Sequence, residues 1–163
     1  MLTRIMQLYL TQHGKAVEKT VDPDRPLSVQ GRHEVTAVAH YLKQANTRIY
    51  EILHSDKTRA AQTAEIFAEI LNVSRVKQVD CVKPNDAIEP MAELIADINE
   101  NTMLVSHIPF LPRLLHLLLT GETEVEPAAL PGNIVCLEQS EDHQWLLSGT
   151  TSYDNFSPGN DTN

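Results

Sequence analysis

Apolar runs of strand length alternate with segments of helical periodicity along most of this 163-residue chain. Residues 5–10 form a mostly apolar run followed by a turn signal, as expected of a buried strand. After Ser28, residues 35–42 place apolar side chains at the i, i+3, i+4, i+7 spacing of one helix face. Segments of the same two kinds follow, with strands expected at 49–53, 76–79 and 102–105 and helices at 60–71, 91–98 and 111–118. This alternation predicts an α/β fold: a three-layer α/β/α sandwich around a mainly parallel sheet.

The last part of the chain departs from this alternation. Residues 134–137 and 145–147 are joined by a polar stretch and predict an antiparallel hairpin. From Ser152 onward the sequence is polar and aperiodic and contains Gly and Pro, which predicts a surface tail. We therefore expect a single domain over residues 1–151 and a polar tail over residues 152–163.

Charge and cysteine content exclude several classes of function. Thirteen Lys and Arg against 22 Asp and Glu give a net charge of −9, which argues against a nucleic-acid binder and against binding to anionic membranes. Cys81 and Cys136 lie far apart in apolar runs without a CxxC, which is typical of buried thiols rather than of a disulfide framework or a zinc site. With no export signal and no apolar segment near the ~20 residues of a membrane span, we expect a cytoplasmic protein.

Chemically active side chains follow three of the expected strands. His13 and Lys15 come after the first strand, Arg59 after the second and His107 after the strand at 102–105. The carboxyl ends of parallel strands meet at one edge of a sheet, where the following helices begin and offer free N–H groups to anions. Gly14 would let the backbone approach a ligand closely. The sequence therefore predicts an oxyanion or phosphate pocket that contains two imidazoles.

The motifs at these strand ends resemble those of the histidine phosphatase superfamily. The superfamily motifs are His13-Gly14, Ser55-x-x-x-Arg59-Ala60-x-x-Thr63 and Ser106-His107-x-Pro109, in that order. The stretch from Asp22 to Ser28, DPDRPLS, and the Pro-Asn-Asp at 84–86 are similar to the SixA-type phosphohistidine phosphatases within it. The resemblance spans roughly residues 5–149 and implies the phosphoglycerate mutase-like form of the α/β sandwich.

The resemblance implies a role for each matching residue. His13 would be the nucleophile that forms a phosphohistidine intermediate, and Arg59 would hold two phosphoryl oxygens through its planar fork. His107 would bind the phosphoryl group, stabilise charge during transfer and shuttle a proton. Arg25 and Asp22 would lie near the mouth of the site. No metal ion and no other cofactor is implied, because positioned cations and helix dipoles meet the charge of the transferring group.

Gln12 departs from the family, which has an arginine before the nucleophile. A glutamine donates hydrogen bonds without charge, and losing one positioned donor costs ~10²–10³ in rate in comparable sites. Lys15 is expected to supply a compensating charge beside Gln12. We therefore expect a phosphatase that has low or specialised activity. The alternatives are a non-catalytic module that binds phosphate or a phosphoprotein, and a small-molecule phosphomonoesterase.

The long helical insertion that covers the site in larger family members is absent from this sequence. An uncovered pocket suits a bulky partner such as a phosphorylated protein, whereas a small phosphate ester is the other candidate substrate. A phosphorylated imidazole is also a good leaving group and needs less help from an acid than a sugar hydroxyl. Asp86, Glu89 and Glu93 are the candidates for a general acid.

Overall fold

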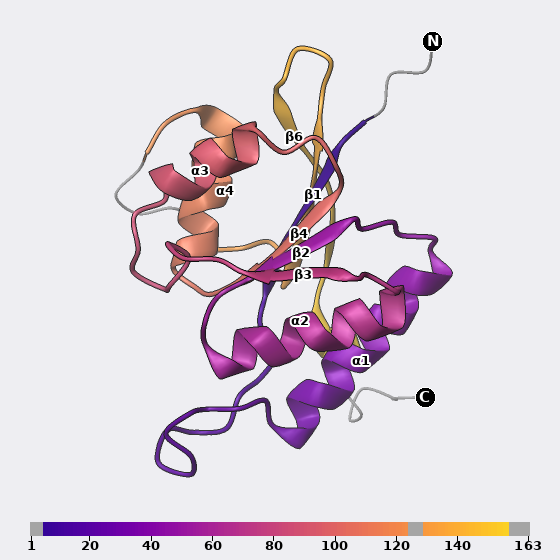
Figure 1. Ribbon diagram of the computed structural model, residues 1–163, viewed down its shortest axis with the longest axis vertical. Coiled ribbons are helices and arrows are strands. Elements are labelled where there is room, and N and C mark those ends of the chain that lie inside the picture. The colour runs from indigo at the N-terminus through magenta and orange to yellow at the C-terminus, as the bar shows by residue number, and fades with distance from the viewer. Residues whose placement is uncertain (1–4, 124–128, 157–163) are drawn as a thin grey trace.

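A mixed sheet of six strands, in the order β3-β2-β4-β1-β5-β6, forms the middle layer of the protein (Figure 1). The structure, a computed structural model, describes residues 5–123 and 129–156. The first four strands run parallel to one another, β5 is antiparallel to β1, and β6 is antiparallel to β5. The strands are β1 (Gln7–Gln12), β2 (Glu51–His54), β3 (Arg75–Gln78), β4 (Thr102–Ser106), β5 (Ile134–Gln139) and β6 (Trp145–Thr151).

Helices cover both faces of this sheet, which confirms the predicted three-layer α/β/α architecture (Figure 1). The helices α1 (Val29–Gln44) and α2 (Thr58–Leu71) pack on one face, and α3 (Glu89–Ala96) and α4 (Phe110–Thr120) on the other. Side chains alternate along each strand, so β1 sends Leu8 and Leu10 to the α4 side and Tyr9 to the α1 side. Burial of both faces explains why β1 and β4 read as nearly continuous apolar runs.

The serines that precede α1 and α2 have different roles. Ser28 is the N-cap of α1, where its Oγ accepts a hydrogen bond of 3.0 Å from the Gly31 N–H. Ser55 is not the N-cap: α2 begins at Thr58 with Lys57 as its N-cap. The Ser55 Oγ accepts from the Lys57 N–H over 3.1 Å and also lies 2.8 Å from His107 Nε2.

The C-terminal stretch differs from the expected surface tail. Residues Tyr153–Phe156 form a 3-10 helix, η1, and Tyr153 is buried against the core that α1 and α2 share. Residues 157–163 of that expected tail lie outside the described residues. The boundary between a domain at 1–151 and a separate tail stays a prediction.

The cysteine prediction was wrong for Cys81, whose side chain is exposed, while Cys136 is partly buried on β5. Cys81 stands in the loop after β3 with a positive φ of 66°, a conformation that loops tolerate and strands do not. Within the described part of the chain, no helix has the length and apolar character needed to cross a membrane.

Candidate active site

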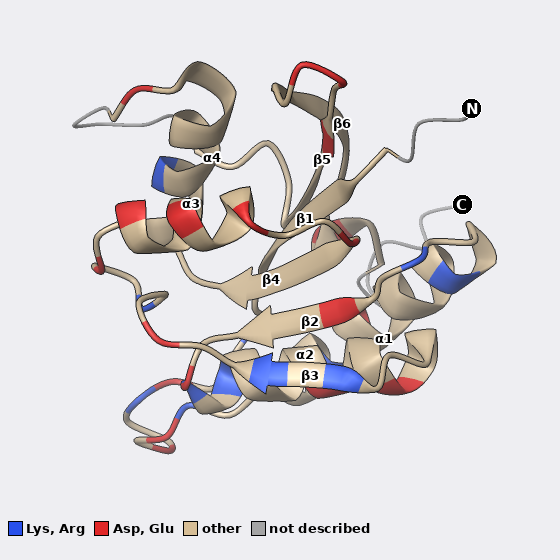
Figure 2. Cartoon of the chain, turned by 45° about the horizontal axis from the view of Figure 1, so that its top comes forward, with Lys and Arg blue, Asp and Glu red and all other residues tan. Residues whose placement is uncertain are grey.

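The strand register brings the two motif histidines together. Gln12 of β1 is paired with Ser106 of β4, so the residues that follow them, His13 and His107, leave the sheet side by side. The His13 N–H also donates to the Ser106 carbonyl over 3.1 Å. The two imidazole rings meet edge to face, with centroids 5.0 Å apart. The arrowheads in Figure 2 show β2 and β4 ending at the same edge of the sheet.

His13 carries its lone pair on Nε2. Its Nδ1 lies 2.7 Å from the Gly14 carbonyl, which only accepts, so Nδ1 carries the proton and donates. Arg59, in the first turn of α2, donates from Nε to His13 Nε2 over 3.2 Å. Burial, helped by the charges of Arg59 and Arg25 and opposed by the Gly14 hydrogen bond, lowers the pKa of His13 to about 4. At neutral pH the ring is therefore the neutral tautomer that a nucleophile needs.

His107 is buried and neutral as well. Burial is the first cause that lowers its pKa to about 3, followed by the charges of His13, Arg59 and Lys57, with Asp56 acting the other way. Its Nε2 lies 2.8 Å from the Ser55 Oγ. Its Nδ1 is buried without a hydrogen-bond partner among the described residues.

Thr63 ties the loop that begins at His13 to α2. The Gly14 N–H donates to the Thr63 Oγ1 over 3.0 Å, and that hydroxyl donates to the Arg59 carbonyl over 2.8 Å. Packing requires a glycine at position 14, because an added Cβ would lie 2.6 Å from a methyl of Val35 in α1. Burial, with a smaller contribution from Arg25, lowers the pKa of Arg59.

A cavity of about 520 Å³ opens beside His13, between the loop after β1 and η1. Four of the predicted substrate-binding residues line it: Gln12, Gly14, Lys15 and Arg25. Asp22 is not among its lining residues and uses its Oδ1 to accept from the Asp24 N–H over 3.0 Å. The loop from β1 to α1 carries charges of both signs along the cavity (Figure 2).

The charge of Lys15 is already paired. Its Nζ lies 3.6 Å from Glu34 Oε1 and 3.6 Å from Asp154 Oδ1. Glu34 is fully buried on α1, and neither carboxylate oxygen has a hydrogen-bond partner within the described residues. Lys15 therefore balances a buried carboxylate and does not serve as a free replacement for the missing arginine.

Two residues that the sequence analysis did not single out surround Gln12. Asn133 donates from Nδ2 to Gln12 Oε1 over 3.0 Å, and the Tyr153 hydroxyl donates to the Gln12 carbonyl over 2.6 Å. Burial and the nearby Glu34 raise the pKa of Tyr153, so its hydroxyl stays protonated. No sequence motif marks either residue.

Comparison with known proteins places the chain in a family. The model of the histidine phosphatase superfamily, branch 1, matches residues 8–82. The phosphohistidine phosphatase SixA of Escherichia coli K12 is 32% identical over 124 residues, which cover 72% of this chain and 77% of the relative. This chain belongs to the histidine phosphatase superfamily.

Solved structures of the superfamily agree with the observed fold. A structure of the protein histidine phosphatase SixA with tungstate has a TM-score of 0.79 and 27% identity, covering 92% of this chain and 99% of that one. The native structure of mycobacterial glucosyl-3-phosphoglycerate phosphatase has a TM-score of 0.66 at 16% identity, covering 91% of this chain and all of that one, and shows the fold alone. The predicted phosphoglycerate mutase-like fold is therefore confirmed.

The three residues expected as candidates for a general acid do not line the cavity beside His13. Asp86 Oδ2 accepts from the Lys83 N–H over 2.9 Å and so shapes an exposed turn. Glu89 and Glu93 lie on exposed positions of α3, and neither these two nor Asp86 line the cavity beside His13. Within residues 5–123 and 129–156, no group of three or more His, Cys, Asp or Glu is arranged to hold a metal ion.

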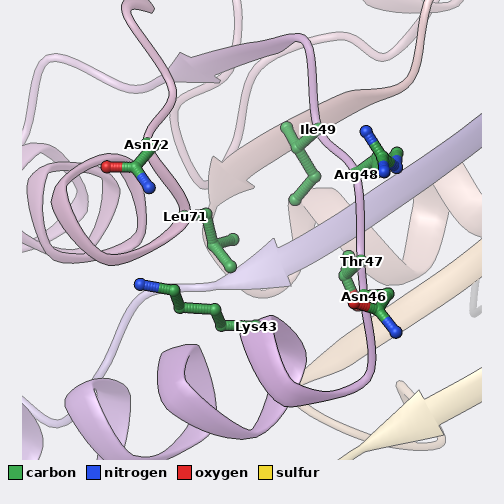
Figure 3. A pocket seen from close by; sticks show the side chains of 7 residues that line it. All are labelled: Lys43, Asn46, Thr47, Arg48, Ile49, Leu71 and Asn72. Atoms are coloured by element: carbon green, nitrogen blue, oxygen red, sulfur yellow. The ribbon is translucent and has the colours of Figure 1, made fainter.

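A second hollow, of about 410 Å³, lies away from the motif residues, where α1 and α2 end (Figure 3). Its lining comes from the end of α1, the loop to β2 and the end of α2: Lys43, Asn46, Thr47, Arg48, Ile49, Leu71 and Asn72. The C-terminal ends of helices carry partial negative charge, which disfavours a phosphate there. The motif residues are thus gathered at the opposite edge of the sheet.

Proposed function

We propose that this protein is a metal-independent phosphatase that forms a covalent phosphohistidine intermediate on His13 and acts on phosphohistidine in a partner protein. The observation that carries the proposal is the tautomer of His13, whose proton is held on Nδ1 by the Gly14 carbonyl while Nε2 keeps its lone pair beside Arg59. A neutral ring at pH 7 is ready to attack without first losing a proton.

The reaction has two steps on this nitrogen. In the first, a bond forms between His13 Nε2 and phosphorus while the bond from phosphorus to the substrate nitrogen breaks, and the departing imidazole takes a proton from water. In the second, a water oxygen attacks phosphorus and gives up a proton, which replaces the one taken from solvent in the first step. The bond from phosphorus to His13 breaks, inorganic phosphate leaves, and Nε2 regains its lone pair.

Arg59 and His107 would meet the charge of the transferring group. Arg59 uses only Nε on His13, so its two terminal nitrogens are available to two phosphoryl oxygens. The Ser55 oxygen accepts from the Lys57 N–H over 3.1 Å, and donating its own proton to His107 Nε2 places the His107 proton on Nδ1. That orphaned, buried Nδ1–H is then a donor that a phosphoryl oxygen would satisfy.

Two features favour a phosphorylated imidazole over a phosphate ester. The low pKa of His107 leaves it neutral at pH 7, so it does not act as an imidazolium acid for a poor leaving group. The carboxyl groups that line the cavity are those of Glu18 in the β1–α1 loop and Asp154 in η1, and the three expected general acids are not among them. The E. coli relative is itself named a phosphohistidine phosphatase. The cavity is open and borders a charged loop, as a protein partner requires.

The decisive experiment compares three substrates. A histidine-phosphorylated carrier protein, an aryl phosphate and a sugar phosphate are each offered to the wild type and to His13→Ala, with EDTA present in a parallel set. We expect turnover of the phosphoprotein to exceed that of the other two, to survive EDTA and to vanish in His13→Ala. An acid-labile, base-stable phosphate on the wild-type enzyme after a quench would identify the intermediate.

Gln12 favours a second candidate function, a module that binds phosphoprotein without turnover. The neutral amide lacks the charge of the family arginine at the reacting group. Binding of the phosphoprotein by the wild type with no release of phosphate would support this module over the enzyme. Faster turnover of the sugar phosphate than of the phosphoprotein would instead indicate a small-molecule phosphomonoesterase.

A further inference from the structure

A chain of hydrogen bonds determines which way the Gln12 amide faces. It begins at the backbone N–H of Tyr153, which donates to Asn133 Oδ1 over 2.7 Å. A backbone N–H can only donate, so this side of the Asn133 amide must be its oxygen and the other side its NH₂ group. That NH₂ donates to the Gln12 side chain over 3.0 Å, so the Gln12 atom there must be Oε1.

The Gln12 NH₂ group stands at the end of this chain of hydrogen bonds. With Oε1 occupied by Asn133, Gln12 keeps both hydrogens of Nε2 for another acceptor, and Gln12, Asn133 and His13 line the same cavity. We propose that Asn133 is a positioning residue, which holds the Gln12 amide with its Nε2 donors toward the phosphoryl group on His13. This inference rests on the proposed function, and it explains how a neutral residue serves where the family has a charged one.

The backbone around this chain is fixed in the same way. The Gln12 N–H donates to the Asn133 carbonyl over 2.8 Å, and the buried Tyr153 hydroxyl donates to the Gln12 carbonyl over 2.6 Å. Gln12 and Asn133 are therefore held at their main chains as well as at their amides. A donor fixed before the substrate arrives stabilises the transition state without the cost of reorienting it.

The test is a double-mutant cycle on kcat/KM for the histidine-phosphorylated carrier protein, with Asn133→Ala, Gln12→Ala and the double variant. If Asn133 acts through the Gln12 amide, Asn133→Ala lowers kcat/KM about tenfold in the wild type and has no further effect once Gln12 is alanine. An equal loss in both backgrounds, or no loss in the wild type, overturns the inference. A wild type that turns over no phosphorylated substrate overturns the proposed function first, and this inference with it.

Asn133→Asp probes orientation in a protein that keeps the contact with Tyr153. Its second oxygen would face Gln12 Oε1, which forces the Gln12 amide to turn its NH₂ toward Asp and its oxygen toward the phosphoryl group. We expect a larger loss in kcat than from Asn133→Ala, and an Asn133→Asp enzyme as active as the wild type overturns the inference. The signals of the Gln12 side-chain NH₂ in NMR should shift on adding inorganic phosphate to the wild type and not to Asn133→Asp.

Asn101→Ala is the matched control for a purely structural amide. Asn101 accepts from the Gln7 N–H and donates to the Arg48 carbonyl, each over 2.9 Å, at the amino-terminal end of β1. Its loss should lower the melting temperature and leave kcat/KM unchanged. If Asn133→Ala behaves in the same way as this control, Asn133 is structural and the inference is overturned.

Discussion

Arg59 donates from Nε to the very nitrogen of His13 that carries the lone pair, over 3.2 Å. The contact holds the His13 ring in place, and it is made by one nitrogen of a guanidinium that has two more. When a phosphoryl group arrives, the same side chain can turn its remaining donors to the oxygens without moving its Cα. In the proposed mechanism, Arg59 thus both positions His13 and binds the phosphoryl group that His13 attacks.

Replacing Arg59 by lysine should separate these two roles. Lysine keeps a positive charge but has neither the Nε donor nor the planar fork, so we expect kcat/KM to fall by at least ~10²-fold. Steady-state kinetics on the histidine-phosphorylated carrier protein measures the effect. Arg48→Lys is the control, because Arg48 lines the hollow at the opposite edge and its loss should leave kcat/KM unchanged. A value for Arg59→Lys within a few-fold of the wild type would mean that the fork is not used.

Stability should fall on acidification because of the two active-site histidines. Their folded-state pKa values of about 4 and about 3 lie below the ordinary 6.5, so between these values the unfolded chain binds more protons than the folded one. The stability that comes from these two histidines is therefore fully present above about pH 6.5, and the free energy of unfolding declines as the pH falls toward 4. Urea unfolding at about pH 7 and about pH 5 measures this decline.

His13→Asn should flatten this pH dependence, because one of the two buried imidazoles is gone. The exposed His33 on α1 provides the control, and His33→Asn should leave the decline as it is in the wild type. A His13→Asn protein that loses as much stability as the wild type between these two pH values would contradict the assignment of the decline to the active site.

Gln12→Arg should lower activity even though it restores the family residue. The guanidinium would meet the Asn133 NH₂, donor against donor, and Tyr153 prevents Asn133 from turning over. We expect kcat/KM on an aryl phosphate and on the phosphoprotein to fall about tenfold. Adding Asn133→Asp supplies an acceptor for the arginine and should recover the activity. A rise in the single variant would show instead that Gln12 is a weakened arginine position.

The Lys15 and Glu34 pair should matter for stability. Lys15→Met leaves a buried carboxylate without its ionic partner, and because Lys15 is half exposed we expect a loss of only about 1 kcal/mol in the free energy of unfolding. Glu34→Gln in the same protein removes the charge and should recover most of the loss. Lys83→Met breaks an ion pair whose two side chains are both exposed and should cost less than about 0.5 kcal/mol. Equal losses in the two lysine variants would contradict this account.

The convergence of His13, Arg59 and His107 was predictable because it follows from strand direction alone. Once β1, β4 and β2 are parallel neighbours, their carboxyl ends share one edge of the sheet. The pairing of Gln12 with Ser106 then places His13 beside His107. Side-chain chemistry within the site was less accessible. Ser55 carries the usual signature of a helix cap, and its Oγ does accept from the Lys57 N–H. The same oxygen also contacts His107 Nε2, and no local sequence pattern reports that contact.

Tyr153 and Glu34 show two different reasons for what the sequence analysis missed. Tyr153 is a lone aromatic in a polar stretch without periodicity, so its burial depends on long-range contacts that no local pattern reports. Glu34 stands four residues before the buried Val38, on the apolar face of α1, and that spacing was a usable signal. A charge on such a face indicates a paired or functional group.

The strand that ends just before His13, β1, has hydrogen-bonded neighbours on both sides, β4 and β5, so its amides can exchange with solvent only when the sheet itself opens. The loop before α1, which borders the cavity, is largely exposed, with Val21 75% accessible. Its opening costs far less, since few buried contacts are lost. In the proposed mechanism the chemistry therefore stands on a rigid sheet edge, and the partner protein meets this exposed loop. Sequence changes in the loop would then alter partner choice while the geometry around His13 stays intact.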